Sequence, residues 1–224
     1  MKMRLTSTPP RDEVYALRIR SITLGFVVAL ISYLIGGSIA VPPSSLKEPM
    51  SEPPLTTFTK VVVRPQVEGV MKAGETLSNV TLIPLNLTLS ILVFVINTLS
   101  AFFLLVPFLV LRKNRVKERW EARLGLIAPL IFYMIIFLKT GCAAQILSSG
   151  YTELLLVPHT YLEFLGFSLV FSFSYQIMRN YWDMPLEEVE KISVEVRSWR
   201  TIHRLLPLIP LLLLAAFLEI NWMV

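Results

Sequence analysis

The sequence predicts an all-α protein, a polytopic membrane helix bundle, and three observations indicate it. Of the 224 residues, 54% are hydrophobic and only 17% are charged, whereas an ordinary soluble domain has roughly 25% charged residues. The mean hydropathy is +0.63, and long stretches carry no charge at all. Basic residues gather in three of the segments that separate these stretches. An apolar excess of this size needs a solvent other than water, and lipid is that solvent.

Stretches without charge locate the spans, because a charged side chain at mid-bilayer costs about 2.5–3.5 kcal/mol. Residues 21–46 and 76–111 are free of charge, and each is long enough for the roughly 20 residues that cross the hydrocarbon. Later apolar stretches reach that length only when single ionisable residues are included. The chain is therefore predicted to be one membrane domain, residues 1–224, with five transmembrane helices at about 21–41, 84–111, 124–147, 154–178 and 205–221.

The first stretch could also be read as a secretory signal peptide, since basic residues precede it and Ser38-Ile39-Ala40 resembles a cleavage site. Its apolar part is longer than that of a usual signal peptide, so we expect an uncleaved anchor.

The basic residues predict the orientation. Sixteen of the 21 lysines and arginines lie before the first span or in the loops 112–123 and 179–204. With five spans these segments share one side, which the positive-inside rule assigns to the cytoplasm. We therefore expect a multi-pass protein of the cell membrane with a cytoplasmic N-terminus and an extracytoplasmic C-terminus.

Two segments outside the spans have distinct compositions. The extracytoplasmic loop 42–83 is rich in proline, and its stretch 56–63 is either a short strand or a loop over the helix ends. Asn79 and Asn86 fit the N-glycosylation pattern, which occurs often by chance. On the other side, apolar residues recur at helical spacing over 185–203, and Pro185 suits a helix start. This pattern predicts an amphipathic helix that lies on the cytoplasmic face or docks a partner protein.

The candidate site residues inside the predicted spans are Asn97, Lys139, His159, Glu163 and Glu219. An ionisable residue within the bilayer is a candidate for a functional site. His159 and Glu163 are four residues apart, which places them on one helix face. At 1.5 Å per residue, Lys139, His159 and Glu219 fall at one level in the outer part of the bilayer, with Glu163 deeper. Asn97 should face a neighbouring helix, because a polar group is costly against lipid.

Three interpretations of this cluster stay open. In the first it is structural: Lys139 pairs with Glu163 or Glu219, and His159 and Asn97 form hydrogen bonds between helices. In the second the residues line a path for transport, and in the third His159 and Glu163 serve an intramembrane hydrolase. The hydrolase has least support, because zinc chemistry usually requires three protein ligands and the HExxH pattern is absent.

Three segments resemble the stage II sporulation protein M-like family of multi-pass membrane proteins, as a distant branch. Residues 156–163, LVPHTYLE, are similar to the family's Pro-His signature; residues 91–105 resemble its Asn-containing span, and residues 211–219 its closing helix. The resemblance places Asn97, Pro158, His159, Glu163 and Glu219 at signature positions. It implies a membrane scaffold, which in sporulating bacteria assembles with peptidoglycan hydrolases.

The leading hypothesis is therefore a non-enzymatic scaffold or subunit of a membrane complex, whose protein partner docks on the 185–203 helix. The alternative is a permease-like subunit with an intramembrane polar path. Neither hypothesis requires a catalytic residue, metal site, cofactor or nucleic acid, and the single cysteine, Cys142, excludes a disulfide framework. The lipid bilayer is the expected surrounding, and a homo-oligomer stays open.

Overall fold

Helices form the described part of this chain, as predicted. The structure is a computed structural model that describes residues 11–40, 64–111, 116, 118–147, 158–198 and 203–223. Within these ranges there is no strand. The helices are α1 (Arg11–Ala40), α3 (Arg64–Thr81), α4 (Leu85–Phe103), α5 (Val106–Val110), α6 (Arg119–Leu147), α8 (Pro158–Tyr181), the 3-10 helix η2 (Leu186–Glu188), α9 (Glu190–Arg197) and α11 (Leu208–Met223). The proline-rich part of the loop 42–83, with the possible strand 56–63, lies outside the described residues.

Four helical segments of the described chain are long and apolar enough to cross a membrane. They cover Arg18–Ser38, Leu85–Phe103, Arg119–Cys142 and His203–Asn221. These segments overlap the predicted first, second, third and fifth spans. The predicted fourth span, 154–178, corresponds to α8, which begins at Pro158 and falls outside this set.

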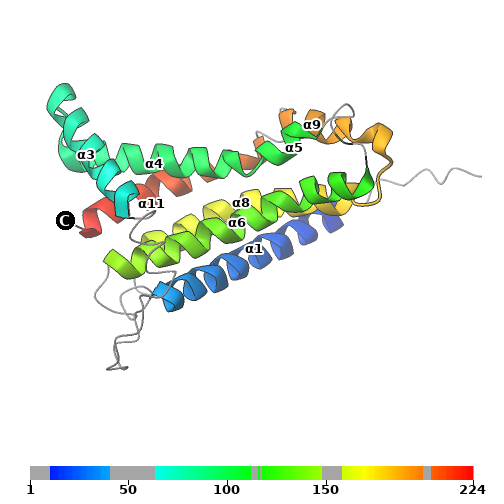
Figure 1. The fold of residues 1–224 in the computed structure, drawn as a ribbon, viewed down its shortest axis with the longest axis horizontal. Coiled ribbons are helices and arrows are strands. Elements are labelled where there is room, and N and C mark those ends of the chain that lie inside the picture. The colour runs from blue at the N-terminus through cyan, green and yellow to red at the C-terminus, as the bar shows by residue number, and fades with distance from the viewer. Residues whose placement is uncertain are drawn as a thin grey trace, which may run out of the picture.

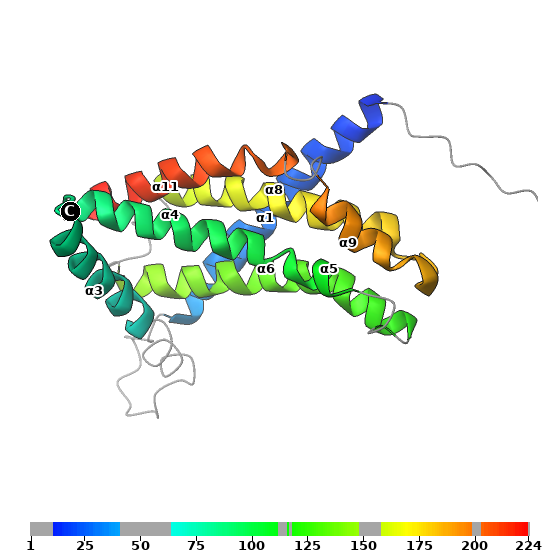
Figure 2. The same cartoon turned by 90° about the horizontal axis from the view of Figure 1, so that it is seen from above.

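The long helices run alternately up and down the molecule. Figures 1 and 2 show α1, α6 and α11 running in one direction, and α4, α5 and α8 in the other. The C-terminus lies at the same end as α3, whereas α5 and α9 lie at the opposite end (Figure 1). We call these the α3 end and the α9 end. α1 packs mainly on α6 and α8, and α11 packs between α8 and α4.

Glycines bring α1 and α6 into backbone contact. A Cβ atom added to Gly36 would lie 2.0 Å from the carbonyl oxygen of Leu138, and one added to Gly141 would lie 2.0 Å from that of Tyr33. The thiol of Cys142 donates to the Gly36 carbonyl at 3.1 Å. Small residues allow such close approach between helices in lipid, where van der Waals contact drives association.

α8 is a largely buried helix, and two of its serines, Ser168 and Ser172, have hydroxyl partners on neighbouring helices. The hydroxyl oxygens of Ser172 and Ser21 on α1 are 2.5 Å apart. Tyr133 on α6 donates to the Gly25 carbonyl at 2.8 Å and lies 3.3 Å from the Ser168 hydroxyl. The serines lower the apolarity of α8, but they are buried against other helices, so they would meet no lipid.

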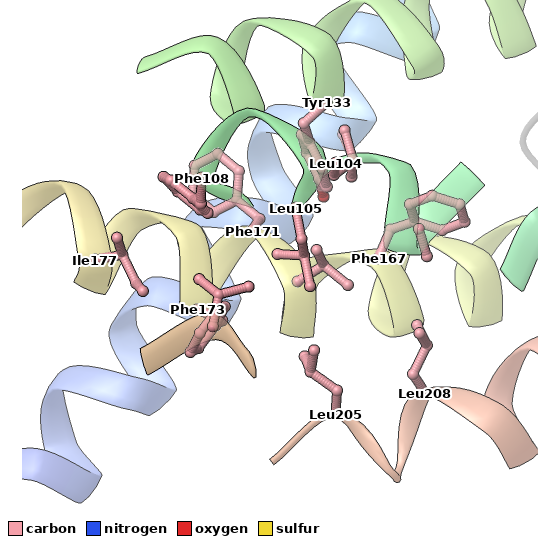
Figure 3. Close-up of a cluster of buried hydrophobic side chains, with 14 of the residues drawn as sticks. Leu104, Leu105, Phe108, Tyr133, Phe167, Phe171, Phe173, Ile177, Leu205 and Leu208 are labelled. Atoms are coloured by element: carbon pink, nitrogen blue, oxygen red, sulfur yellow. The ribbon is translucent and has the colours of Figure 1, made fainter. Parts of the chain in front are cut away.

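The second predicted span is broken near its end. α4 ends at Phe103, a turn follows at Leu104 and Leu105, and the short α5 continues from Val106. Pro107 explains the break, because proline has no N–H to bond the carbonyl four residues earlier and its ring clashes with that carbonyl. The turn lies in the main hydrophobic core (Figure 3), where Leu104 and Phe108 pack among Tyr133, Phe171 and neighbouring side chains.

The amphipathic segment on the α9 end is shorter than predicted. Instead of one helix over 185–203, η2 and α9 end at Arg197, and Ser198 is extended. The apolar face is as predicted, since Val189, Ile192 and Val196 are buried. α9 contacts α5, so this face covers the protein's own core, and the exposed face carries charged residues together with Val194.

α3 is a helix where no regular element was predicted. Pro65 stands in its first turn, and Gly74 lets it approach α4, because a Cβ there would lie 2.3 Å from the Leu89 side chain. Leu82 then turns the chain into α4 with a positive φ of 58°. α3 is amphipathic but polar overall, so a search for long apolar stretches without charge did not reveal it. The predicted glycosylation sites Asn79 and Asn86 are both exposed.

The α1–α6 contact predicts that Gly36→Ala destabilises the protein by about 1–3 kcal/mol, the usual cost of overpacking. The new methyl group would displace backbone rather than a flexible side chain. Gly69→Ala is the matched control, because nothing lies within 4 Å of its added Cβ, and it should be neutral or stabilising by about 0.5–1 kcal/mol. Thermal unfolding in detergent measures both; equal effects would contradict the contact.

Candidate functional site

A cavity of about 320 Å³ lies toward the α3 end of the bundle. Five helices contribute to it: α3, α4, α6, α8 and α11. Its lining is mostly apolar, with a few polar groups, as is usual for sites that bind small molecules. The polar and ionisable lining residues are Gln66, Asn97, Ser100, Lys139, Thr140, Glu163 and Glu219.

The cavity follows from the way α4 and α6 separate. Their side chains meet at Phe103 and Phe132, whose ring centroids are 6.4 Å apart. The lining residues of α4 end at Ser100 and those of α6 begin at Ile136, so all of them lie on the α3 side of that contact. α3 adds Gln66, Val70 and Met71 from one helix face.

A hydrogen bond joins α4 to α8 at the cavity. The side-chain amide of Asn97 donates to Oε1 of Glu163 at 2.5 Å. Glu163 is only 8% exposed, and α4 and α8 otherwise contact each other much less than either contacts α11. The prediction that Asn97 bonds to a neighbouring helix is confirmed.

A second carboxyl reaches the same cavity from α11. Glu219 lines it beside Ile220, together with Glu163 of α8. α11 lies close to α8 because Gly166 leaves room for leucine side chains of α11: a Cβ added to Gly166 would be 3.2 Å from the Leu212 side chain. Two carboxyls therefore lie near each other, away from bulk water.

Lys139 lines the cavity without pairing to either carboxyl, and the expected ion pair is wrong. The ion pairs between described residues join Arg123 to Asp183 and Lys191 to Glu188; none within 4.0 Å involves Lys139. The side chain is half-buried and lines the same cavity as Glu163 and Glu219. The similar predicted depth of Lys139 and Glu219 did not imply contact, because depth does not fix the direction in which each side chain points.

His159 does not join the other four residues. It is buried in the first turn of α8, one turn from Glu163, but it is not among the residues that line the cavity. Its Nδ1 atom has no hydrogen-bond partner among the described residues, which differs from the expected bond between helices. Pro158 begins α8, as its place before His159 suggested.

Three polar residues of the cavity lining were not identified from the sequence: Gln66, Ser100 and Thr140. Gln66 belongs to the unrecognised helix α3. Thr140 follows Lys139 directly, and Ser100 is three residues after Asn97, so each lies next to a residue that was recognised. The spacing of Ser100 from Asn97 was the available signal, because residues three apart share a helix face.

No protein-family model matches this chain, and no curated protein or solved structure is significantly similar to it. The class of the protein therefore rests on its fold and cavity. Its described residues are helical, with four helices suited to a membrane, and four of the five candidate residues predicted from the sequence meet at one cavity.

The cavity predicts that position 140 is accessible to water. A Thr140→Cys variant in liposomes should react with a trimethylammonium methanethiosulfonate at least tenfold faster than Ile135→Cys, measured as intact mass. Ile135 is a matched control because it is on the same helix, 54% exposed on the outer surface and outside the cavity lining. The native Cys142 is fully buried and should stay unmodified. Equally slow reaction at both positions would mean a dry, packed site.

Proposed function

We propose that this chain is a non-enzymatic membrane protein of five spans that binds a ligand in the polar cavity, as a permease-like subunit would. The observation that carries the proposal is the cavity itself, which is lined by Asn97, Lys139, Glu163 and Glu219. A purely structural cluster would be expected to pair Lys139 with a carboxyl, since an unpaired charge is costly in lipid. A group that enters the cavity can supply the missing partner.

The fifth span in this proposal is α8. Its 24 residues extend about 36 Å, enough for the roughly 30 Å hydrocarbon core. It runs beside the four apolar helices. Its direction is opposite to that of α6 before it and α11 after it, as expected for successive membrane spans (Figures 1 and 2). Its serines are buried among those helices, so modest apolarity is compatible with a membrane position.

The orientation places the α9 end in the cytoplasm. Arginines of several helices lie there, and Arg18 donates to the carbonyl of Arg204 at 3.1 Å. The guanidinium of Arg123 lies 5.1 Å from the centre of the Trp182 ring and 3.4 Å from the Asp183 carboxylate. Such basic and aromatic residues are typical of the cytoplasmic membrane interface. The cavity then faces the outer half of the bilayer.

A second candidate function is a scaffold in a membrane complex. The exposed charged face of η2 and α9 favours it, because this face carries Glu187, Glu190, Lys191 and Arg197 above a buried apolar face. A protein partner would bind there by complementary charge. The resemblance to the stage II sporulation protein M-like family points the same way. The hydrolase has less support, because His159 does not line the cavity that Glu163 lines.

Reconstitution distinguishes transport from a scaffold role. Liposomes containing the purified chain are incubated with a cell extract of small metabolites and analysed by mass spectrometry. We expect at least one metabolite to accumulate above empty liposomes, and Glu163→Gln to reduce the accumulation at least tenfold. Glu75→Gln, an exposed residue of α3 outside the lining, should leave it unchanged.

Two results would contradict the transport proposal. One is accumulation no greater than in empty liposomes; the other is an equal rate for wild type and Glu163→Gln. In either case, co-purification of a protein in mild detergent, lost on charge reversal of Lys191 and Arg197, would support the scaffold.

A further inference from the structure

The ionisable residues of the cavity have both signs of charge on different helices. Lys139 comes from α6, whereas Glu163 and Glu219 come from α8 and α11. The ammonium has no carboxylate within 4.0 Å among the described residues, and the two carboxyls line the same cavity from adjacent helices. Positive and negative groups therefore border one space without neutralising each other directly.

We propose that the cavity binds a small zwitterion with an apolar body, of the α-amino acid class. The ligand carboxylate would lie toward Lys139 and its ammonium toward Glu163 and Glu219. This inference rests on the proposed function of the cavity as a ligand site, and it adds the chemical class of the ligand.

Charge favours a zwitterion over the other classes. A simple cation would be attracted by the carboxyls but repelled by Lys139. A simple anion would be attracted by Lys139 but repelled by the carboxyls. Either ligand would leave one sign of charge in the cavity without an opposite group, and an unpaired charge is costly in the bilayer. An uncharged ligand would leave the ionisable side chains without partners. A zwitterion offers a carboxylate to Lys139 and an ammonium to the two carboxyls.

The Asn97 bond defines one side of the carboxyl site. Since Asn97 donates to Oε1 of Glu163, that carboxyl is held in place from α4. The second oxygen and the Glu219 carboxyl remain to accept hydrogen bonds from an ammonium group, which has three donors. This arrangement fixes where the positive end of the ligand would lie.

Size and walls fit a compact molecule with an apolar part. About 320 Å³ is at the lower end of the roughly 300–1,000 Å³ that ligand sites occupy. The remaining lining is aliphatic and aromatic, and includes Leu89, Val93, Ile136, Phe137 and Phe167. The side chain of valine, leucine or methionine would be buried against these walls.

Isosteric probes test the charge requirement directly on the purified full chain. Five amino acids (valine, leucine, isoleucine, methionine and phenylalanine) are compared with their amides, which lack the carboxylate, and with their deamino acids, which lack the ammonium. Binding is measured by calorimetry in detergent at pH 7. We expect at least one amino acid to bind, and its amide and deamino analogue to bind at least tenfold more weakly.

Variants assign the two ends of the ligand. Lys139→Met and Glu163→Gln should each weaken binding of that amino acid at least tenfold, while Lys139→Arg should retain it. Lys72→Met and Glu75→Gln are matched controls, since both residues are exposed on α3 outside the lining. The comparison of amino acids with their amides and deamino acids uses the unaltered chain. It therefore tests the zwitterion requirement even if a substitution prevents folding.

Three outcomes would overturn the inference: no amino acid binds, an amide binds as tightly as its acid, or a deamino acid binds as tightly as its parent. If metabolite uptake still depends on Glu163 in those cases, the ligand site stands and only the zwitterion is wrong. If uptake and amino acid binding both fail, the ligand site itself is wrong.

Discussion

The bond between Asn97 and Glu163 is the interaction on which the arrangement of this bundle depends. A carboxyl at the level of Glu163 is tolerable only if neighbouring helices surround it and supply a donor. Asn97 supplies that donor from α4, and α11 lies beside both helices. Ser168 and Ser172 of α8 are buried in the same way, with hydroxyl partners on α6 and α1. Polarity thus places α8 inside the bundle rather than at its lipid surface.

The cavity results from two features that keep α4 and α6 apart at the α3 end. Backbone contact through Gly36 and Gly141 holds α6 against α1, while α4 follows α11 instead. The break at Leu104 and Leu105 then returns the chain to α6 through α5. Between these contacts the walls separate, and the polar side chains of four helices face a common space. A tightly packed structural network would have closed that space.

Much of the fold was predictable, because charge-free stretches and basic loops directly reflect the cost of charge in lipid. Asn97 and Glu163 were recognisable as site residues for the same reason. Contacts between side chains were less accessible: Lys139 and Glu219 have a similar predicted depth, but depth does not give the rotation of each helix. The helix α3 is amphipathic but polar overall, so the search for apolar stretches without charge passed over it, and the break before Pro107 lay inside a continuous apolar stretch. These features depend on tertiary packing.

The most direct test of this account is a double-mutant cycle for Asn97→Ala and Glu163→Ala, measured as the free energy of unfolding in detergent. We expect a coupling energy of about 0.5–2 kcal/mol, since bonded pairs couple and hydrogen bonds between membrane helices reach about 1.7 kcal/mol. The pair Asn86→Ala and Glu163→Ala is the control, because Asn86 is exposed at the start of the same helix. Additivity within about 0.3 kcal/mol for Asn97 and Glu163 would contradict the role assigned to their bond.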